Sequence, residues 1–151
     1  MTETNTTATG GSTESQPQPA ADKGGLRGMV IDDSRAARAM VGRMLEQLGF
    51  TVDTAEHGAD ALQKLNPSFP PDAILVDWNM PVMDGVAFAR SLRNIGAFKT
   101  TPLLMISSES DPRRVASALL AGIDEYLFKP VDTDTLQARL ELLGVNFGGE
   151  E

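Results

Sequence analysis

The chain has 151 residues, which suggests one domain, and 41% of them are hydrophobic, enough for a sizeable core. It has no cysteine, which excludes disulfides and thiolate metal sites, and its formal net charge of −8 argues against nonspecific binding of nucleic acid. We see neither an apolar run that could span a membrane nor a secretory signal, so we expect a cytoplasmic protein.

The first 25 residues differ in kind from the rest. They are mostly Thr, Ser, Gly, Gln, Pro and Ala, and such a segment buries too little apolar surface to offset the entropy lost on ordering. We predict a disordered low-complexity tail over 1–25, a folded domain over 26–147 and a short acidic end over 148–151. The tail is expected to act as a tether or a solubilising extension.

From Leu26 onward, short apolar runs alternate with segments of helical spacing. The runs predict strands over residues 29–31, 50–55, 73–76, 103–106 and 125–128. Helices are predicted after each strand from apolar residues three or four positions apart: Ala37, Met40, Val41, Met44, Leu45 and Leu48; Ala59, Leu62 and Leu65; Val86, Ala89, Leu92 and Ile95; Val115 and Leu119; and Leu136, Leu140 and Leu143.

Three helix ends have sequence signals. Ser34 is the expected cap of the first helix and Gly49 its end, while Asp111 followed by Pro112 marks the start of the fourth. His57, the single histidine, lies near the start of the second helix and is expected to be a plain surface residue.

Five βα units in succession predict an α/β fold with a parallel sheet, right-handed crossovers and helices on both faces. Two strand orders are common for such sheets. Five strands in about 125 residues favour the flavodoxin-like order 2-1-3-4-5.

Polar side chains follow four of the five predicted strands. Asp32 and Asp33 follow the first strand, Asp77 the third, Ser107 the fourth and Lys129 the fifth. In this strand order the first and third strands are neighbours, and ligands bind at the carboxyl ends of the strands. We therefore expect three carboxylates, a hydroxyl and an ammonium to converge on one edge of the sheet.

That set of groups points to magnesium and phosphate chemistry. Carboxylates this close raise each other's pKa, and Mg²⁺, unlike zinc, suits an all-oxygen ligand set. A phosphoryl group bound there would also meet the ammonium of Lys129 and the hydroxyl of Ser107. Because an aspartate can attack phosphorus to give an aspartyl phosphate, the central Asp77 is the candidate nucleophile.

Taken singly, each residue has a structural explanation. Any of the three aspartates could cap a helix or a turn, Ser107 could be a turn residue, and Lys129 could be a solvated surface lysine. Their joint occurrence at four strand ends favours a functional site.

The chain resembles the receiver domains of two-component response regulators, most closely the stand-alone CheY-type chemotaxis regulators, over roughly residues 26–145. The match lies in the acidic pair 32–33, the loop DWNMPVMDG at 77–85, Ser107, and the spacing of Tyr126 from Lys129-Pro130. The resemblance implies that a partner histidine kinase phosphorylates Asp77. It also implies a protein that promotes only its own phosphorylation and dephosphorylation and is otherwise not an enzyme.

The resemblance further implies a ligand set. Asp33, Asp77 and the backbone carbonyl of Asn79 would bind Mg²⁺, with Asp32 contributing through water. Lys129 would contact the phosphoryl group, beside a cis bond to the following proline.

A switch is implied in the same way. Ser107 would move toward the phosphoryl oxygen and Tyr126 would turn inward, altering a surface over about residues 112–143. The alternative for Tyr126 is a half-buried strand residue with its hydroxyl in water. In the family, the positions that Asn79 and Glu109 occupy tune the phosphoryl lifetime, and because these residues match the CheY-type pair, the resemblance implies a short-lived signal.

The sequence ends soon after its last predicted helix, so we expect output through a protein contact. One hypothesis is a regulator that binds a target such as a flagellar motor switch when phosphorylated; a second is a phosphorelay shuttle or phosphate sink working with a histidine phosphotransfer protein, and a phosphatase is a further potential partner. A third, a phosphatase of the haloacid dehalogenase kind, needs a second acid where this chain has Asn79. Two features depart from the receiver pattern: Ser108, where Ala or Gly is usual, and the N-terminal tail.

Overall fold

The computed structural model describes residues 25–147. Its strands are β1 (Leu26–Ile31), β2 (Phe50–Ala55), β3 (Ala73–Val76), β4 (Leu103–Ser107) and β5 (Glu125–Phe128). Its helices are α2 (Arg35–Gln47), α3 (Gly58–Lys64), α4 (Gly85–Arg93), α5 (Pro112–Ala121) and α6 (Thr133–Leu142), with a short 3₁₀ turn, η2 (Gly96–Phe98). Apart from Gly25, the predicted tail over 1–25 lies outside the described residues, and so does the predicted acidic end over 148–151.

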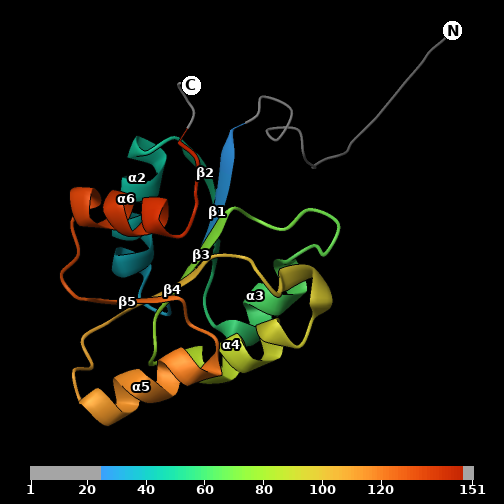
Figure 1. Ribbon diagram of the computed structural model, residues 1–151, viewed down its shortest axis with the longest axis vertical. Coiled ribbons are helices and arrows are strands. Elements are labelled where there is room, and N and C mark those ends of the chain that lie inside the picture. The colour runs from blue at the N-terminus through green and yellow to red at the C-terminus, as the bar shows by residue number, and fades with distance from the viewer. Residues whose placement is uncertain (1–24, 148–151) are drawn as a thin grey trace, which may run out of the picture.

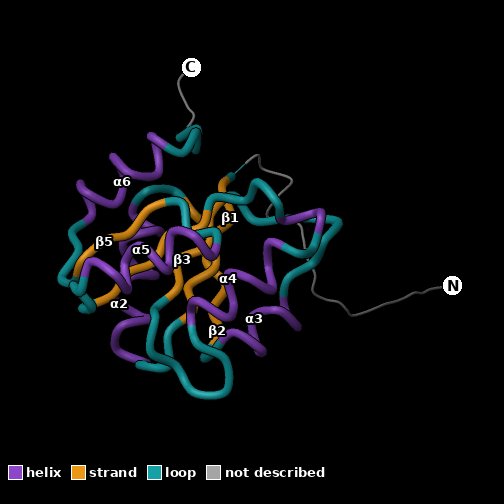
Figure 2. The backbone as a smooth tube through the Cα atoms, turned by 60° about the horizontal axis from the view of Figure 1, so that its bottom comes forward, coloured by secondary structure: helices purple, strands orange, loops and turns teal. Residues whose placement is uncertain are grey.

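The five strands form one parallel sheet in the order β2-β1-β3-β4-β5, as predicted. Helices α2 and α6 cover one face, and α3, α4 and α5 cover the other (Figure 1). Figure 2 shows the strands running through the centre of the molecule with helices around them. Ile31 at the end of β1 is in register with Val76 at the end of β3, so the residues that follow these strands emerge side by side.

Each face of the sheet has its own apolar core. On the α2 and α6 side, the buried helix residues Leu45 and Leu140 pack over strand residues such as Leu104. On the other side, Phe88 of α4 and Ala118 of α5 are fully buried. Within residues 25–147, no helix combines the length and apolar character needed to cross a membrane.

Local signals account for most element boundaries. The Ser34 hydroxyl caps α2 by accepting a hydrogen bond from the Ala37 N–H at 3.2 Å, and Gly49 has a positive φ of 100° just beyond the end of that helix. Strand β1 starts three residues earlier than predicted, because residues 26–28 pair with the start of β2 although Arg27 and Gly28 are not apolar.

Three of the apolar residues whose spacing predicted the helices do not face the core. Met40 is 50% exposed and Leu119 is 45% exposed, while Ile95 is exposed because α4 ends at Arg93. In α5 the buried positions are instead Ala118 and Ala121, and Val115 is only partly buried. The inward face of α5 is thus lined by small residues, which an apolar pattern weighted toward large side chains does not reveal.

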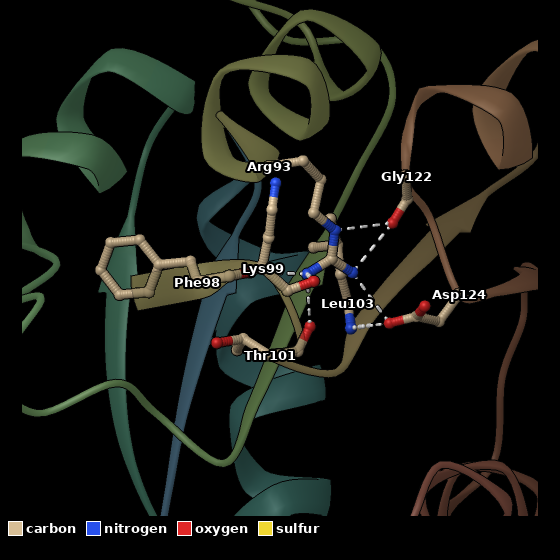
Figure 3. Close-up of polar contacts among 7 residues, drawn as sticks. All are labelled: Arg93, Phe98, Lys99, Thr101, Leu103, Gly122 and Asp124. Carbon is tan, nitrogen blue, oxygen red and sulfur yellow. Dashed lines mark hydrogen bonds and ion pairs between the residues drawn. The ribbon is translucent and has the colours of Figure 1, made fainter. Parts of the chain in front are cut away.

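The amino-terminal edge of the sheet is tied together by Arg93, at the end of α4 (Figure 3). Its guanidinium donates hydrogen bonds of 2.8–3.2 Å to five acceptors: the carbonyl oxygens of Phe98, Lys99, Thr101 and Gly122 and the carboxylate of Asp124. The same Asp124 oxygen accepts the Leu103 N–H at 2.9 Å. We refer to Arg93 and these acceptors as the Arg93 cluster; it joins α4 to the beginnings of β4 and β5.

Candidate functional site

Three aspartates meet at the carboxyl edge of the sheet. One carboxylate oxygen from each of Asp32, Asp33 and Asp77 lies within 4.8 Å of the other two. The parallel pairing of β1 and β3 brings them together, and the Asp77 N–H extends it by donating to the Ile31 carbonyl at 2.9 Å. Asp32 is buried, Asp77 is partly buried and Asp33 is exposed, so the cluster is open to solvent on one side.

Lys129 reaches this cluster from the end of β5. Its Nζ lies 3.3 Å from a carboxylate oxygen of Asp77 and 3.4 Å from one of Asp32. The Lys129 N–H donates to the Ser107 carbonyl at 2.9 Å, which continues the β4–β5 pairing and orients the lysine. The peptide bond from Lys129 to Pro130 is cis, as expected from the resemblance.

The charges in this cluster are not balanced. Burial raises the pKa of Asp77 and the charge of Asp32 raises it further, while Lys129 acts in the opposite direction. Burial lowers the pKa of Lys129, but the two carboxylates outweigh it and the net shift is upward. Three carboxylates thus face one ammonium among the described residues, and the excess negative charge and oxygen-only ligands fit a divalent cation such as Mg²⁺.

The end of β4 forms the second side of the site. Ser107 is buried, and its Oγ accepts a hydrogen bond from the Glu109 N–H at 3.1 Å. The Tyr126 hydroxyl donates to the Glu109 carbonyl at 2.8 Å. Burial raises the pKa of Tyr126, a hydrogen bond with Ser107 opposes that shift, and the charge of Glu109 adds to it. Tyr126 is partly buried, as the alternative of a half-buried strand residue expects, and its hydroxyl has a hydrogen-bond partner within the protein.

The loop after Asp77 is held by close backbone packing. The Gly85 N–H donates to the Trp78 carbonyl at 2.9 Å, and a Cβ at position 85 would collide with the Asp77 carbonyl oxygen. Val82, 80% exposed, has a positive φ of 69°, which is strained for a β-branched residue. Asn79 is exposed in the same loop, two residues beyond Asp77.

Glu109 is fixed through its side chain as well as its backbone. One carboxylate oxygen accepts the Asp111 N–H at 3.0 Å, and the other lies 3.1 Å from Nε of Arg114. The Arg114 guanidinium also lies 4.7 Å from the ring centroid of Trp78, the residue that follows Asp77. Ser108, between Ser107 and Glu109, is exposed.

The sequence analysis missed three supporting residues. Arg38 donates to the Asp32 carbonyl at 2.7 Å, and Arg114 contacts both Glu109 and Trp78. His57 is not a plain surface residue: its Nδ1 accepts the Asp60 N–H at 3.1 Å, so it caps α3. A basic residue in the first turn of a helix is unfavourable next to the helix dipole, but Arg113 shares this turn, so the pattern alone does not single out Arg114.

Comparison with known proteins identifies the class. Residues 29–141 match the response regulator receiver domain, and the chain belongs to that family. Proteins of this family act in two-component signalling, are generally not enzymes in the usual sense, and share an acidic Mg²⁺-binding pocket and a phosphorylated aspartate.

Individual relatives agree with this assignment. Chemotaxis protein CheY1 of Helicobacter pylori is 37% identical over 120 residues, which cover 78% of this chain and 97% of that protein. The structure of chemotaxis protein CheY4 of Vibrio cholerae is 34% identical with a TM-score of 0.72, covering 78% and 98% of the two chains. The receiver domain of sensor histidine kinase PA1611 of Pseudomonas aeruginosa, solved with a magnesium ion coordinated in its active site cleft, is 26% identical with a TM-score of 0.72, covering 79% and 97%.

Proposed function

We propose that this chain is a single-domain response regulator that accepts a phosphoryl group on Asp77 from a histidine kinase and signals through phosphorylation-dependent protein binding. One observation carries the proposal. The Asp77 carboxylate stands at the carboxyl edge of the sheet between two further aspartates and the Lys129 ammonium, 3.3 Å away. This geometry supports the proposal because Asp77 would act as nucleophile, the neighbouring aspartates as cation ligands and Lys129 as a fixed positive charge at one site.

Each residue has a role in the proposed transfer. Asp33, Asp77 and the backbone carbonyl of Asn79 would hold Mg²⁺, with Asp32 acting through water. When bound, the ion supplies charge neutralisation for the carboxylates and the phosphoryl oxygens. Lys129 contributes a second positive charge, and the Ser107 hydroxyl a hydrogen-bond donor, to the oxygens of the transferred group.

The transfer itself needs little covalent chemistry from the protein. A carboxylate oxygen of Asp77 forms a P–O bond as the P–N bond to the kinase histidine breaks, and the bonding electron pair returns to the imidazole nitrogen. The chain accelerates this step by holding Asp77 and Lys129 in place, because positioning and charge stabilisation dominate phosphoryl transfer.

Output would follow from the contacts between the site and α5. Ser107 and Tyr126 both hydrogen-bond to the backbone of Glu109, so a movement of Ser107 toward a phosphoryl group alters the partner that holds Tyr126. The affected surface is formed by α5, β5 and α6. Asn79 and Glu109 are assigned the tuning of phosphoryl lifetime, and the signal is expected to be short-lived.

The pathway we favour is chemotaxis, in the cytoplasm, with a flagellar motor switch protein as target. Its support is the similarity to chemotaxis proteins of Helicobacter pylori and Vibrio cholerae. The phosphorelay shuttle or phosphate sink remains the second candidate. Tighter binding of the phosphorylated chain to a motor protein favours the first, whereas rapid back-transfer to a histidine phosphotransfer domain favours the second.

The test is an intact-mass measurement after incubation with acetyl phosphate. The wild type should gain one phosphoryl group only when Mg²⁺ is present, and Asp77→Asn should gain none. If the wild type gains nothing with Mg²⁺, or if the variant is labelled equally, Asp77 is not the acceptor and the proposal fails.

A further inference from the structure

Arg114 lies in the first turn of α5, where the helix dipole disfavours a positive charge. Helix α5, all of whose residues are described, has two arginines and no acidic residue in its first turn, although a helix amino terminus is already positive. Its neighbour Arg113 has a side chain that is 92% exposed and pairs only with Asp111, at 3.6 Å, among its described ion pairs. Arg114 instead turns toward the candidate site. A residue that is unfavourable in its own helix is expected to have a compensating role elsewhere.

The first contact of Arg114 is with Trp78. The guanidinium lies 4.7 Å from the ring centroid of this buried residue, within the range of a cation–π interaction. The Trp78 ring also meets the ring of Tyr126 edge-on, with centroids 6.3 Å apart. One aromatic ring, directly after Asp77 in the chain, thus joins α5 to the strand that carries Tyr126.

The second contact is with Glu109. Arg114 Nε lies 3.1 Å from one carboxylate oxygen of Glu109, whose other oxygen accepts the Asp111 N–H. The backbone of Glu109 bonds to the Ser107 hydroxyl and the Tyr126 hydroxyl. Arg114 therefore contacts both Trp78, in the loop after Asp77, and Glu109, the residue whose backbone bonds to Ser107 and Tyr126.

We propose that Arg114 is a positioning residue: through Glu109 and Trp78 it favours the inward position of Tyr126, which is the position expected when a phosphoryl group is at Asp77, and it thereby strengthens binding of a phosphoryl group there. The inference rests on the proposed function. Its physical basis is linkage: the apparent affinity of a ligand that prefers one arrangement is proportional to the fraction of molecules already in it. Loss of Arg114 lowers that fraction without touching a ligating atom.

The experiment is a titration of beryllofluoride, a phosphoryl mimic, in the presence of Mg²⁺, followed by ¹⁹F NMR so that the readout does not depend on Trp78. We expect Arg114→Gln to raise the half-saturating concentration about 3- to 10-fold, the combined factor for a half-exposed cation–π contact and an ion pair. Arg113→Gln is the matched control, since it removes the same charge from the same turn, and should change it less than about 2-fold. Arg114→Lys should fall between them, because an ammonium keeps the charge but cannot stack as a plane.

The outcomes separate two failures. If the wild type binds beryllofluoride with Mg²⁺ and Arg114→Gln binds equally well, the inference is overturned while the proposed function stands, even if urea denaturation shows the variant to be less stable. Equal weakening by Arg113→Gln also overturns it, because local charge would then be the cause. If the wild type shows no Mg²⁺-dependent binding, the proposed function fails first. Arg114→Lys supplies the comparison should the glutamine variant not fold.

Discussion

The two edges of the sheet differ in how their charged side chains are paired. At the amino-terminal edge, the single guanidinium of Arg93 meets five oxygen acceptors, and its side chain is only 17% exposed. At the carboxyl edge, three carboxylates cluster, and two of them, those of Asp77 and Asp32, share the ammonium of Lys129 at 3.3–3.4 Å. At the first edge the charge of Arg93 is matched by acceptors within the chain, whereas the second edge holds excess negative charge that a bound cation would neutralise.

The difference separates stability from function within one sheet. Four of the acceptors of Arg93 are backbone carbonyls near the starts of β4 and β5, so this edge is expected to hold the fold together. The carboxyl edge carries the cost of repulsion and burial in the free protein. Where a structure tolerates such a cost, binding or catalysis is the usual reason.

Breaking the Arg93 cluster should have the largest effect. Arg93→Met is expected to lower the free energy of unfolding by about 2–4 kcal/mol, because several partly buried acceptors lose a charged donor. The measurement is urea denaturation, with Arg90→Met as the control, since Arg90 is exposed on the same helix. Equal losses in the two variants would mean that the cluster adds nothing beyond helix propensity.

Removing charge from the carboxyl edge should raise stability, which is the opposite of the effect of Arg93→Met. Without Mg²⁺ at neutral pH, Asp77→Asn is expected to raise the melting temperature by about 1–3 °C, because it removes a partly buried carboxylate next to Asp32. Adding Mg²⁺ at ten times its Kd should stabilise the wild type by about 1.4 kcal/mol and the variant less. A variant that is less stable than the wild type in EDTA would contradict the view that this edge is under electrostatic stress.

The same contrast predicts a pH dependence. Folding raises the pKa of Asp77 above its unfolded value of about 4, so ionisation costs stability in the folded protein. That cost is absent below the unfolded pKa and grows as the pH rises through the folded pKa. The advantage of Asp77→Asn should therefore be full near neutral pH and vanish at about pH 4 in melting curves recorded with EDTA. An advantage that grows toward low pH would reverse the assigned sign.

A comparably small effect is expected from backbone strain beside the site. Val82→Asn should raise the free energy of unfolding by about 0.5–1 kcal/mol, because Asn tolerates a positive φ better than a β-branched residue. Val82→Ala should recover less, since alanine is also strained there. Urea denaturation of the three proteins measures the order, and a variant no more stable than the wild type would show that the strain is relieved elsewhere.

The sequence was sufficient for the fold and for the residues at the strand ends. Apolar runs marked β3 and β5 at their observed bounds, and the strand order brought Asp32, Asp77 and Lys129 together because parallel strands share one carboxyl edge. It was insufficient where a charged side chain acts across the fold. Arg93 lies on the apolar stripe of α4, seven residues after Val86, but its partners come from two separate segments, 98–101 and 122–124, that only the tertiary structure brings together.

Arg114 and His57 illustrate the same limit at shorter range. The contact of Arg114 with Trp78 depends on the position of α5 relative to the loop after β3, and no local sequence pattern determines that position. His57 caps its helix through a ring nitrogen, whereas the residues usually expected at that position are Ser, Thr, Asp and Asn. In each case the missing information is an orientation in space and not a residue type.

Strand order also governs when the site can exist during synthesis and refolding. Asp32 and Lys129 are 97 positions apart in the chain, yet their side chains meet. Contacts of such long sequence separation form late, because a large loop must close before they can be made. A chain whose last strand has not docked carries the aspartates without their lysine. Under the proposed function, competence for phosphorylation therefore reports that the chain has folded from its first strand to its last.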